Sequence, residues 1–426
     1  MSTAPRPGPV ADADADAPRS WSNRLAGALT HRNFRIVWFA ALGSTIGTWM
    51  QKYAQSWLVF DLTRSNFYLG VDDFLSQLPI LLFMLIGGVI ADRHDRRRLL
   101  TGSQYTQAFS AFALAVLVWT GHITIPLLFA LSFISGLGQA FGGPAYQALI
   151  PSLVPRRDLP NAIALNSTQF NLSRVLGPVA GGAVLTFIGA AWCFALNGVS
   201  FFLVVFALAA LHLPPHVPST APRAIGDELR SGLHYVRDNR ILMVLTILAF
   251  ITTFLAMPVS TLLPTFANDV HGGIGTPQSR LWMLMACQGL GAILGALIVG
   301  SLGRLKHMGR ALLAMQMMLG LLIAAFAASR SLPASLILLF LSGICSMAVF
   351  SMSFSLLQLT VPDHLRGRVI SIYMVALRGG WPIGSLVAGA LADVFTAPSV
   401  MIVNALVLAT LAGLMLLRRH GTLNQA

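Results

Sequence analysis

Long apolar runs constrain this chain more than any other feature of its sequence. Twelve such runs recur between Phe34 and Leu417, and a run of about 20 apolar residues is long enough to cross a bilayer as an α-helix. A helix satisfies its own backbone hydrogen bonds, which lipid cannot do. We therefore predict an all-α membrane protein with spans near residues 34–60, 67–91, 98–120, 124–150, 161–187, 190–212, 240–267, 280–302, 310–328, 333–360, 367–393 and 398–417.

Charge is scarce and unevenly placed. Only 10% of the 426 residues are charged and 55% are hydrophobic, whereas a soluble protein carries roughly 25% charged residues. If the N-terminal tail lies inside, 22 of the 28 Lys and Arg residues fall on the inner side. This asymmetry predicts that both termini are cytoplasmic in a bacterial inner membrane. The net charge of +13 then reflects contact with anionic lipid and does not indicate nucleic acid.

The apolar spans divide the chain into two sets of six. The linker between them contains IGDELRSGLHYVRDN, in which Asp227 can cap an amphipathic helix with Leu229, Leu233 and Val236 on one face. A solvated linker is the alternative. The expected units are a disordered tail (1–33), a six-helix half (34–212), the cytoplasmic linker (213–239), a second half (240–417) and a cytoplasmic tail (418–426).

An internal repeat supports two pseudo-symmetric halves. The fifth span contains Arg174 and Pro178, and the eleventh contains Arg378 and Pro382. Both pairs are four residues apart, and the two copies are separated by 204 positions. Repeats of this kind are common in transporters that work by rocking one half against the other.

A compact charged motif follows the second span, where residues 88–98 read GVIADRHDRRR. The motif resembles the signature loop of the major facilitator superfamily, G-x-x-x-D-R-x-G-R-R. The matching residues are Gly88, Asp92, Arg93, Arg96 and Arg97. Asp95 replaces the glycine, and because Asp tolerates left-handed backbone we expect the turn to be kept. The resemblance implies a conformational gate in which Asp92 meets the start of the eleventh span. The alternative is a stop-transfer cluster that only anchors the helix.

Further motifs narrow the resemblance to exporters. HRNFR (31–35), GTWMQK (47–52) and SWLVFDLT (56–63) are similar to the branch that holds siderophore exporters, lysophospholipid transporters and multidrug efflux pumps, the transmembrane secretion effectors. GPVAGG (177–182) is similar to the end of the antiporter motif of such exporters. Pro178 bends a helix and Gly177 permits close packing, so we predict that they form a hinge-like seam between the halves. Ordinary glycine and proline packing is the alternative.

Polar residues inside spans are candidates for a functional role, because inserting an ionisable side chain at the bilayer centre costs about 2.5–3.5 kcal/mol of free energy on insertion scales. Arg174 and Arg378 lie near the midplane of their spans. We hypothesise that they attract an anionic or polar group of a substrate; alternatively, they bond carbonyls freed by the nearby prolines. Gln51, Gln55 and Gln358 are the other predicted substrate-binding residues, and helix packing is their alternative use.

Carboxylates inside spans are scarcer still. Asp72 and Asp73 lie in the second span, and Lys52 lies at a similar depth in the first. Proton coupling needs a carboxyl group whose surroundings change between two states of the transporter. These three residues are therefore the predicted proton-coupling group. A charge pair that simply reaches water is the alternative.

The sequence carries no pattern of an enzyme, a metal site or a bound cofactor: P-loop, G-x-S-x-G, H-E-x-x-H and paired C-x-x-C motifs are missing. We predict a monomeric secondary transporter that exports a small organic molecule, such as a drug, siderophore or secondary metabolite. Transport would proceed by alternating access, with proton antiport. The alternatives are a lysophospholipid flippase, an importer, and a membrane receptor or scaffold that does not transport.

Overall fold

The structure is a computed structural model that describes residues 27–93, 95–211, 225–270, 275–302, 307–362, 365–417 and 423. This part of the chain is almost entirely helical and contains no β-strand. The side chains of residues 84–89, 91–93, 225–230, 269, 270 and 302 lie outside the description.

Two helix groups follow one another along the chain. The first helix group consists of α2 (Arg32–Thr63), α3 (Asn66–Arg93), α4 (Arg96–Trp119), α5 (Ile125–Leu149), α6 (Leu159–Phe187) and α7 (Ala190–Ala209). The second helix group consists of α9 (Arg240–Ala256), α12 (Pro277–Leu302), α13 (Met308–Ala328), α14 (Leu332–Thr360), α15 (Arg366–Phe395) and α16 (Ala397–Leu417). The shorter elements are η1 (Gly27–Thr30), η2 (Ile150–Ser152), η3 (Arg156–Asp158), α8 (Ile225–Asp238), α10 (Pro258–Thr261), α11 (Leu263–Thr265) and the π-helix η4 (Phe266–Val270).

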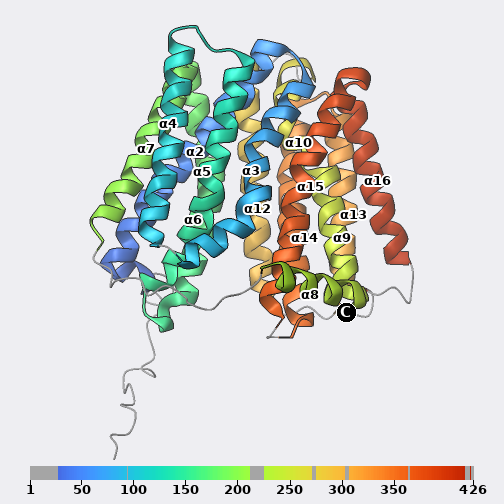
Figure 1. Cartoon of the computed structure of the whole chain (residues 1–426). Helices are drawn as coiled ribbons and strands as arrows, with labels where there is room; N and C mark the ends of the chain where they lie inside the picture. The colour runs from blue at the N-terminus through green and yellow to red at the C-terminus, as the bar shows by residue number, and fades with distance from the viewer. Residues whose placement is uncertain are drawn as a thin grey trace, which may run out of the picture.

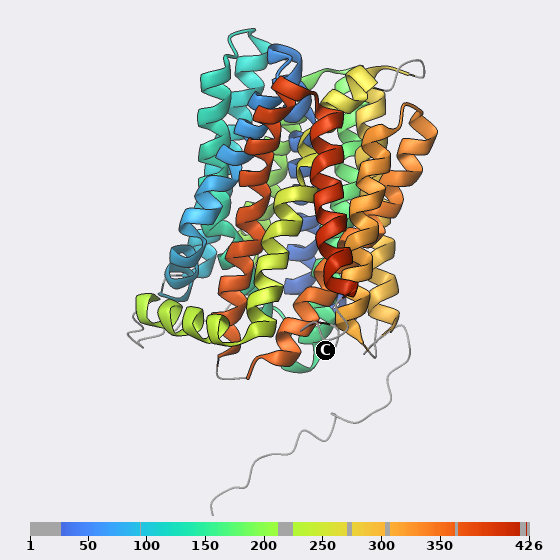
Figure 2. The same cartoon turned by 90° about the vertical axis from the view of Figure 1, so that its right-hand side faces the viewer.

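The groups stand side by side, as Figure 1 shows from blue-green to yellow-red. Helix α8 lies across one end of the bundle, transverse to the long helices (Figures 1 and 2). We call this the α8 end and the opposite one the far end. Helices α3 and α15 pack together across the boundary between the groups, as do α6 and α12. The two helices with the repeated Arg–Pro pair, α6 and α15, thus occupy equivalent places.

Among the side chains that the structure describes, the hydrophobic core is shared at one end only. A large cluster in the far-end half draws buried side chains from both groups, among them Tyr53, Phe194, Phe266 and Phe326. At the α8 end each group has its own cluster. Phe34 and Leu208 belong to that of the first group, and Leu242 and Tyr373 to that of the second. Because lipid tails are as apolar as these side chains, van der Waals packing holds such a cluster together in a membrane. The shared cluster therefore holds the groups together at the far end.

Within the described residues, eight helical segments are long and apolar enough to cross a membrane: Ile125–Ser152, Ala190–Ala209, Arg240–Asn268, Pro277–Ser301, Met308–Ala328, Leu332–Thr360, Arg366–Phe395 and Ala397–Leu417. The long helices α2, α3, α4 and α6 are outside this set. Each carries polar side chains within its length, such as Lys52 in α2, Asp73 in α3, Gln107 in α4 and Arg174 in α6. These are also helices that line the central cavity.

The structure refines one prediction about the helices and corrects another. The span predicted at 240–267 matches the helical segment Arg240–Asn268, but it is not one regular helix, because α9 ends at Ala256 and is followed by α10, α11 and η4. Pro258 and Pro264 have no backbone N–H to donate, so regular hydrogen bonding stops there. Helix α8 begins at Ile225, which places Asp227 inside the first turn and not at the cap.

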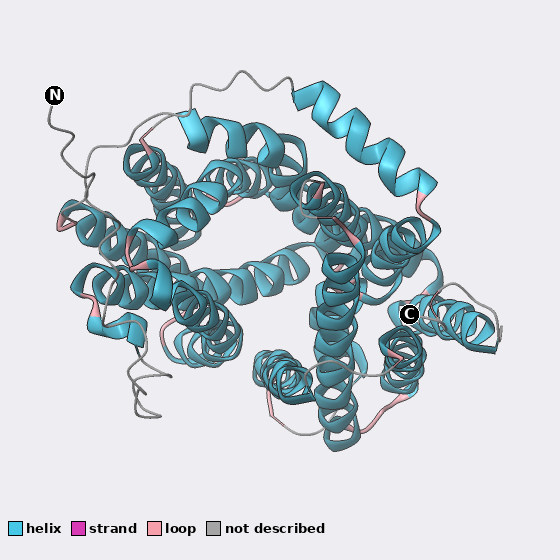
Figure 3. Ribbon diagram, turned by 90° about the horizontal axis from the view of Figure 1, so that it is seen from below, coloured by secondary structure: helices cyan, strands magenta, loops and turns pink. Residues whose placement is uncertain are grey.

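Helix α8 rests on α15. The Arg368 guanidinium donates to Ser231 Oγ at 3.2 Å, and Gly232 lies against Arg368 and Ile372. Val236 is buried, whereas Leu233 on the same helix is 59% exposed. The predicted apolar face is thus split between Val236, which is in contact with the bundle, and Leu233, which is exposed. Figure 3 shows α8 at the periphery of the bundle.

Candidate functional site

A cavity of about 200 Å³ lies between the two helix groups. Most of its wall comes from the first group. The second group and α10 contribute only Ser260, Thr261, Met285, Gln288 and Trp381. Four charged side chains line it, and all were predicted as site residues: Lys52, Asp72, Asp73 and Arg174. Their formal charges cancel, so a ligand meets a polar but neutral enclosure.

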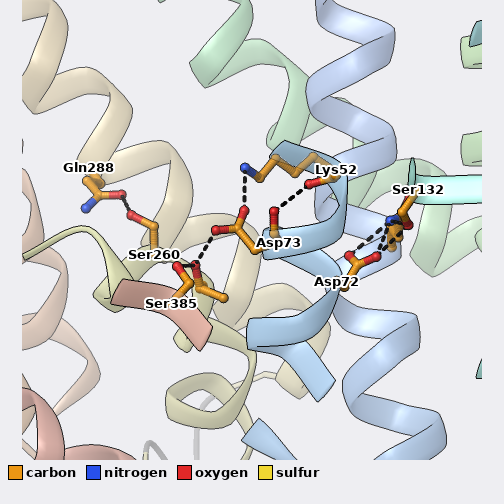
Figure 4. A network of polar contacts seen from close by, with 10 residues as sticks. Lys52, Asp72, Asp73, Ser132, Ser260, Gln288 and Ser385 are labelled. Atoms are coloured by element: carbon orange, nitrogen blue, oxygen red, sulfur yellow. Dashed lines mark hydrogen bonds and ion pairs between the residues drawn. The ribbon is translucent and has the colours of Figure 1, made fainter. Parts of the chain in front are cut away.

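Asp72 is held by a chain of neutral donors within the first group. Gln55 Nε2 donates to both carboxylate oxygens at 2.9 and 3.0 Å, and Ser132 Oγ donates to Oδ1 at 2.6 Å. Gln51 Nε2 donates to Gln55 Oε1 at 3.4 Å, and Asn197 Nδ2 donates to Gln51 Oε1 at 2.7 Å. The chain runs across α3, α5, α2 and α7, so Gln51 and Gln55 position Asp72 as well as line the cavity. Figure 4 shows Asp72 facing Ser132.

Asp73 instead joins the two helix groups. Lys52 Nζ lies 3.3 Å from its Oδ1, and Thr261 Oγ1 of α10 donates to its Oδ2 at 3.4 Å. The Thr261 hydroxyl also bonds Ser385 Oγ of α15 at 2.8 Å. Figure 4 shows that Asp72 and Asp73 point to different neighbours. The cause is helix geometry, since consecutive residues are about 100° apart around the axis.

Arg174 and Trp381 bring unused hydrogen-bond donors to the cavity. The Arg174 guanidinium lies 5.8 Å from the ring centre of Trp49 and has no hydrogen-bond or ion-pair partner among the described residues. Trp381 Nε1 is buried and also lacks a partner in the described part of the chain. A buried N–H of this kind is normally satisfied. Both groups can therefore donate to a bound molecule or to water.

Two of the predicted substrate-binding residues lie elsewhere. Arg378 is exposed on α15, and Gln358 is exposed two residues before α14 ends; the cavity wall includes neither. Sequence reasoning missed Ser132 and Asn197 as partners in the Asp72 chain. Their only signal was a polar residue in an otherwise apolar run.

The signature motif is described only in part. Gly88, Asp92 and Arg93 lie on the last turns of α3, and their side chains are outside the described residues. Arg96 Nη1 donates to the Ala148 carbonyl at 2.8 Å, and Arg97 Nη2 donates to that of Ala209 at 3.1 Å. These two arginines therefore tie the start of α4 to the ends of α5 and α7, within one group.

The expected left-handed turn at Asp95 is wrong. Asp95 has an extended backbone with φ −60° and caps α4, since its carboxylate accepts from the N–H groups of Arg97 and Arg98. An aspartate at this position can satisfy helix N–H groups that a glycine would leave open.

Gly177 and Pro178 lie in α6, but Gly177 faces α2 and not the second group. A Cβ on Gly177 would overlap Trp49, in the same helix group. Gly182 meets the second group, where a Cβ would overlap the Trp282 ring of α12, and Gly289 of α12 lies against Val175 and the Arg174 carbonyl of α6. The close approach between the groups on this side thus involves Gly182 and Gly289, whereas Gly177 packs within its own group.

The far end is closed by a carboxylate of the second group. Asp393, near the end of α15, accepts from the backbone N–H groups of Asn66 at 2.6 Å and Phe67 at 3.2 Å, and from Ser65 Oγ. Asp393 therefore satisfies the free N–H groups at the start of α3 in the way an N-cap side chain does, although it belongs to the other helix group. Thr265 Oγ1 donates to Asn66 Oδ1 at 2.5 Å beside it, and Tyr53 Oη donates to the Gln278 carbonyl at 2.9 Å.

The comparisons place this architecture in a family. A family model described as "Transmembrane secretion effector" matches residues 24–424. The chain belongs to this family. It is a multi-pass membrane transporter of the major facilitator superfamily, and the predicted resemblance is confirmed.

Two curated relatives and one solved structure illustrate the match. The chain is 28% identical to the multidrug efflux pump Tap of Mycolicibacterium fortuitum, over 84% of this chain and 88% of that protein. It is 24% identical to the enterobactin exporter EntS of Citrobacter koseri, over 89% of each. A bacterial homologue of the human lysosomal transporter Spinster, in an inward-facing and unoccupied conformation, superposes with a TM-score of 0.70. That pair shares 14% identity and covers 89% of this chain and 95% of the other.

Proposed function

We propose that this transmembrane secretion effector exports a small organic molecule from the cytoplasm by alternating access, in exchange for protons. In this proposal the two helix groups are two six-helix halves of a monomer with twelve spans. The α8 end is cytoplasmic. The excess of Lys and Arg in the loops at that end supports this orientation.

The observation that carries the proposal is a polar cavity between helix groups that join at one end. The two groups share a core and the Asp393 contacts at the far end, and have separate cores at the α8 end. With the α8 end cytoplasmic, this arrangement is an inward-facing state. The inward-facing conformation named for the Spinster homologue agrees with this assignment.

The surroundings of Asp73 support a role in proton coupling. Asp73 contacts Lys52 of the first group and Thr261 of α10, which is bonded to Ser385 of the second group, so a rearrangement of the groups changes the partners of Asp73. Asp72 keeps its partners within the first group. We propose that Asp72 and Asp73, with Lys52, carry the proton exchange. Arg174, Gln51 and Gln55 contact the cargo, and Gly88, Asp92 and Arg93 remain the predicted gate at the α8 end.

The test uses inside-out membrane vesicles from cells that express the chain, energised with an acidic interior. A panel of small organic compounds of different charge is offered, and uptake is measured by mass spectrometry. We expect uptake of at least one compound that stops when a protonophore is added. The Asp72→Asn/Asp73→Asn variant should lose this uptake, because neither side chain can then exchange a proton. Asp61→Asn is the matched control, since Asp61 is exposed and pairs with Arg64 nearby.

Other outcomes would point to the alternatives. Uptake confined to right-side-out vesicles would indicate an importer, and movement of a fluorescent lysophospholipid between leaflets would indicate a flippase. Binding of a compound without turnover would indicate a receptor. Proton-driven uptake that persists in the double variant would remove the acids from the mechanism.

A further inference from the structure

The ammonium of Lys52 lies in a small enclosure that has the composition of a cation-binding site. Its Nζ is 4.9 Å from the ring centre of Trp381 and 5.8 Å from that of Trp49. The Asp73 carboxylate, which is 6% exposed, lies 3.3 Å from the same atom. A cation within about 6 Å of an aromatic ring centre is attracted to the ring face. Two aromatic faces and one carboxylate therefore surround this ammonium.

The enclosure is assembled from both helix groups. Trp49 and Lys52 belong to α2, Asp73 to α3, and Trp381 to α15. All four line the central cavity. The Lys52 side chain is 40% exposed, so it fills the enclosure without sealing it. A free organic cation that reached the cavity would find these attractive groups already occupied.

We propose that Lys52 determines the cargo class of this transporter. Its ammonium is a built-in occupant of the cage formed by Trp49, Trp381 and Asp73, and it excludes organic cations from the cavity. The inference rests on the proposed function only in taking this cavity as the cargo site. The cargo is then a molecule without a net positive charge.

The balance of charge in the cavity supports the same conclusion. The lining contains two acids and two bases, and Asp73 is already paired with Lys52. The other base, Arg174, has no ion-pair partner among the described residues and lies 5.8 Å from the ring centre of Trp49, the second aromatic ring of the enclosure. A second cation near Trp49 would be repelled by both Lys52 and Arg174. Removal of Lys52 alone changes the formal charge of the lining to −1 and empties the cage.

The test measures equilibrium binding of radiolabelled tetraethylammonium to the purified full-length protein in detergent, by dialysis at constant ionic strength. We expect Lys52→Met to bind this probe at least about tenfold more tightly than the wild type, because the two aromatic faces and the carboxylate are then free to attract it. Lys52→Arg should show no gain because it keeps the charge. Arg64→Met is a matched control: Arg64 also pairs with an aspartate, Asp61, and lies 5.4 Å from the Phe60 ring, but in an exposed position.

The gain must depend on the cage. Adding Asp73→Asn or Trp381→Leu to Lys52→Met should abolish it. Binding by Lys52→Met no tighter than by the wild type would overturn the inference, and so would a gain that survives either second change.

A second measurement covers the case in which Lys52→Met does not fold. Lys52→Cys in a Cys287→Ser background, with Cys193 and Cys345 buried, can be treated with aminoethyl methanethiosulfonate, which restores an ammonium at this position. We expect tetraethylammonium binding before treatment and its loss afterwards; unchanged binding would contradict the inference. Because the assay requires no transport, it separates the cage from the proposed export, and either can fail without the other.

Discussion

The contact between Asp393 and the start of α3 predicts a measurable change in conformation. Asp393→Ala removes the acceptor for two backbone N–H groups and for Ser65 Oγ. Loss of an N-cap costs about 1 kcal/mol, loss of a charge at the helix N-terminus about 0.5 kcal/mol, and loss of the exposed hydroxyl bond about 0.5 kcal/mol. The total loss is about 2 kcal/mol. Only the state in which the far end is closed loses this stabilisation, because only that state makes the Asp393 contacts.

This free energy corresponds to a shift of about 30-fold in the equilibrium between the two states. If the outward-open state is about 1% populated in the wild type, within the usual range for a minor state, it rises to about one quarter. The measurement is the distance distribution between two spin labels at the far end. Thr120 and Arg330 are exposed far-end positions in different helix groups and accept Thr120→Cys and Arg330→Cys. The background carries Cys287→Ser, because the other two cysteines are buried.

We expect a second, longer distance in Asp393→Ala, and a smaller effect of the same kind in Ser65→Ala. Asp61→Ala is the control, since Asp61 is also a far-end aspartate but bonds Arg64 within its own group. An unchanged distribution in Asp393→Ala would refute the reasoning that this carboxylate holds the far end closed.

Two further predictions concern stability, read as thermal unfolding of the purified protein. Gly182→Ala should destabilise the protein by about 1–3 kcal/mol, because its Cβ overlaps Trp282; Gly143→Ala, whose Cβ has no neighbour closer than 3.9 Å, is the control. Equal melting temperatures would disprove the tight α6–α12 seam. Arg97→Ala should cost about 1–2 kcal/mol through its lost bonds to the α7 end. Arg98→Ala, at a side chain that is 91% exposed, should change stability by less than about 0.5 kcal/mol.

Much of the fold follows from local pattern. Runs of apolar residues, and the polar, Gly and Pro residues between them, are enough to place most helices. Each span needs about 20 apolar residues and satisfies its backbone hydrogen bonds within itself. The break after Ala256 was missed although Pro258 and Pro264 are visible in the sequence. An apolar run hides such breaks, since hydropathy does not register the loss of a backbone donor.

The candidate site could also be predicted only in part from the sequence. Lys52, Asp72, Asp73 and Arg174 stand out in the sequence because charge within a span is expensive. Their partners do not stand out: Ser132 and Asn197 are small polar residues that could serve helix packing anywhere. Which of two adjacent acids bonds within one helix group and which bonds across both depends on the rotation of α3 against its neighbours. That rotation is fixed by packing.

The sequence by itself determined that this protein is a helical membrane transporter and where its rare intramembrane charges lie, because lipid imposes the same rule on every span. Only the tertiary structure decided what those charges meet. It places the Lys52 ammonium between Trp49 and Trp381, which come from opposite ends of the chain, and sets Asp393 at the start of α3. Contacts of this kind depend on how two helix groups meet across a shared core, and no local pattern encodes that meeting.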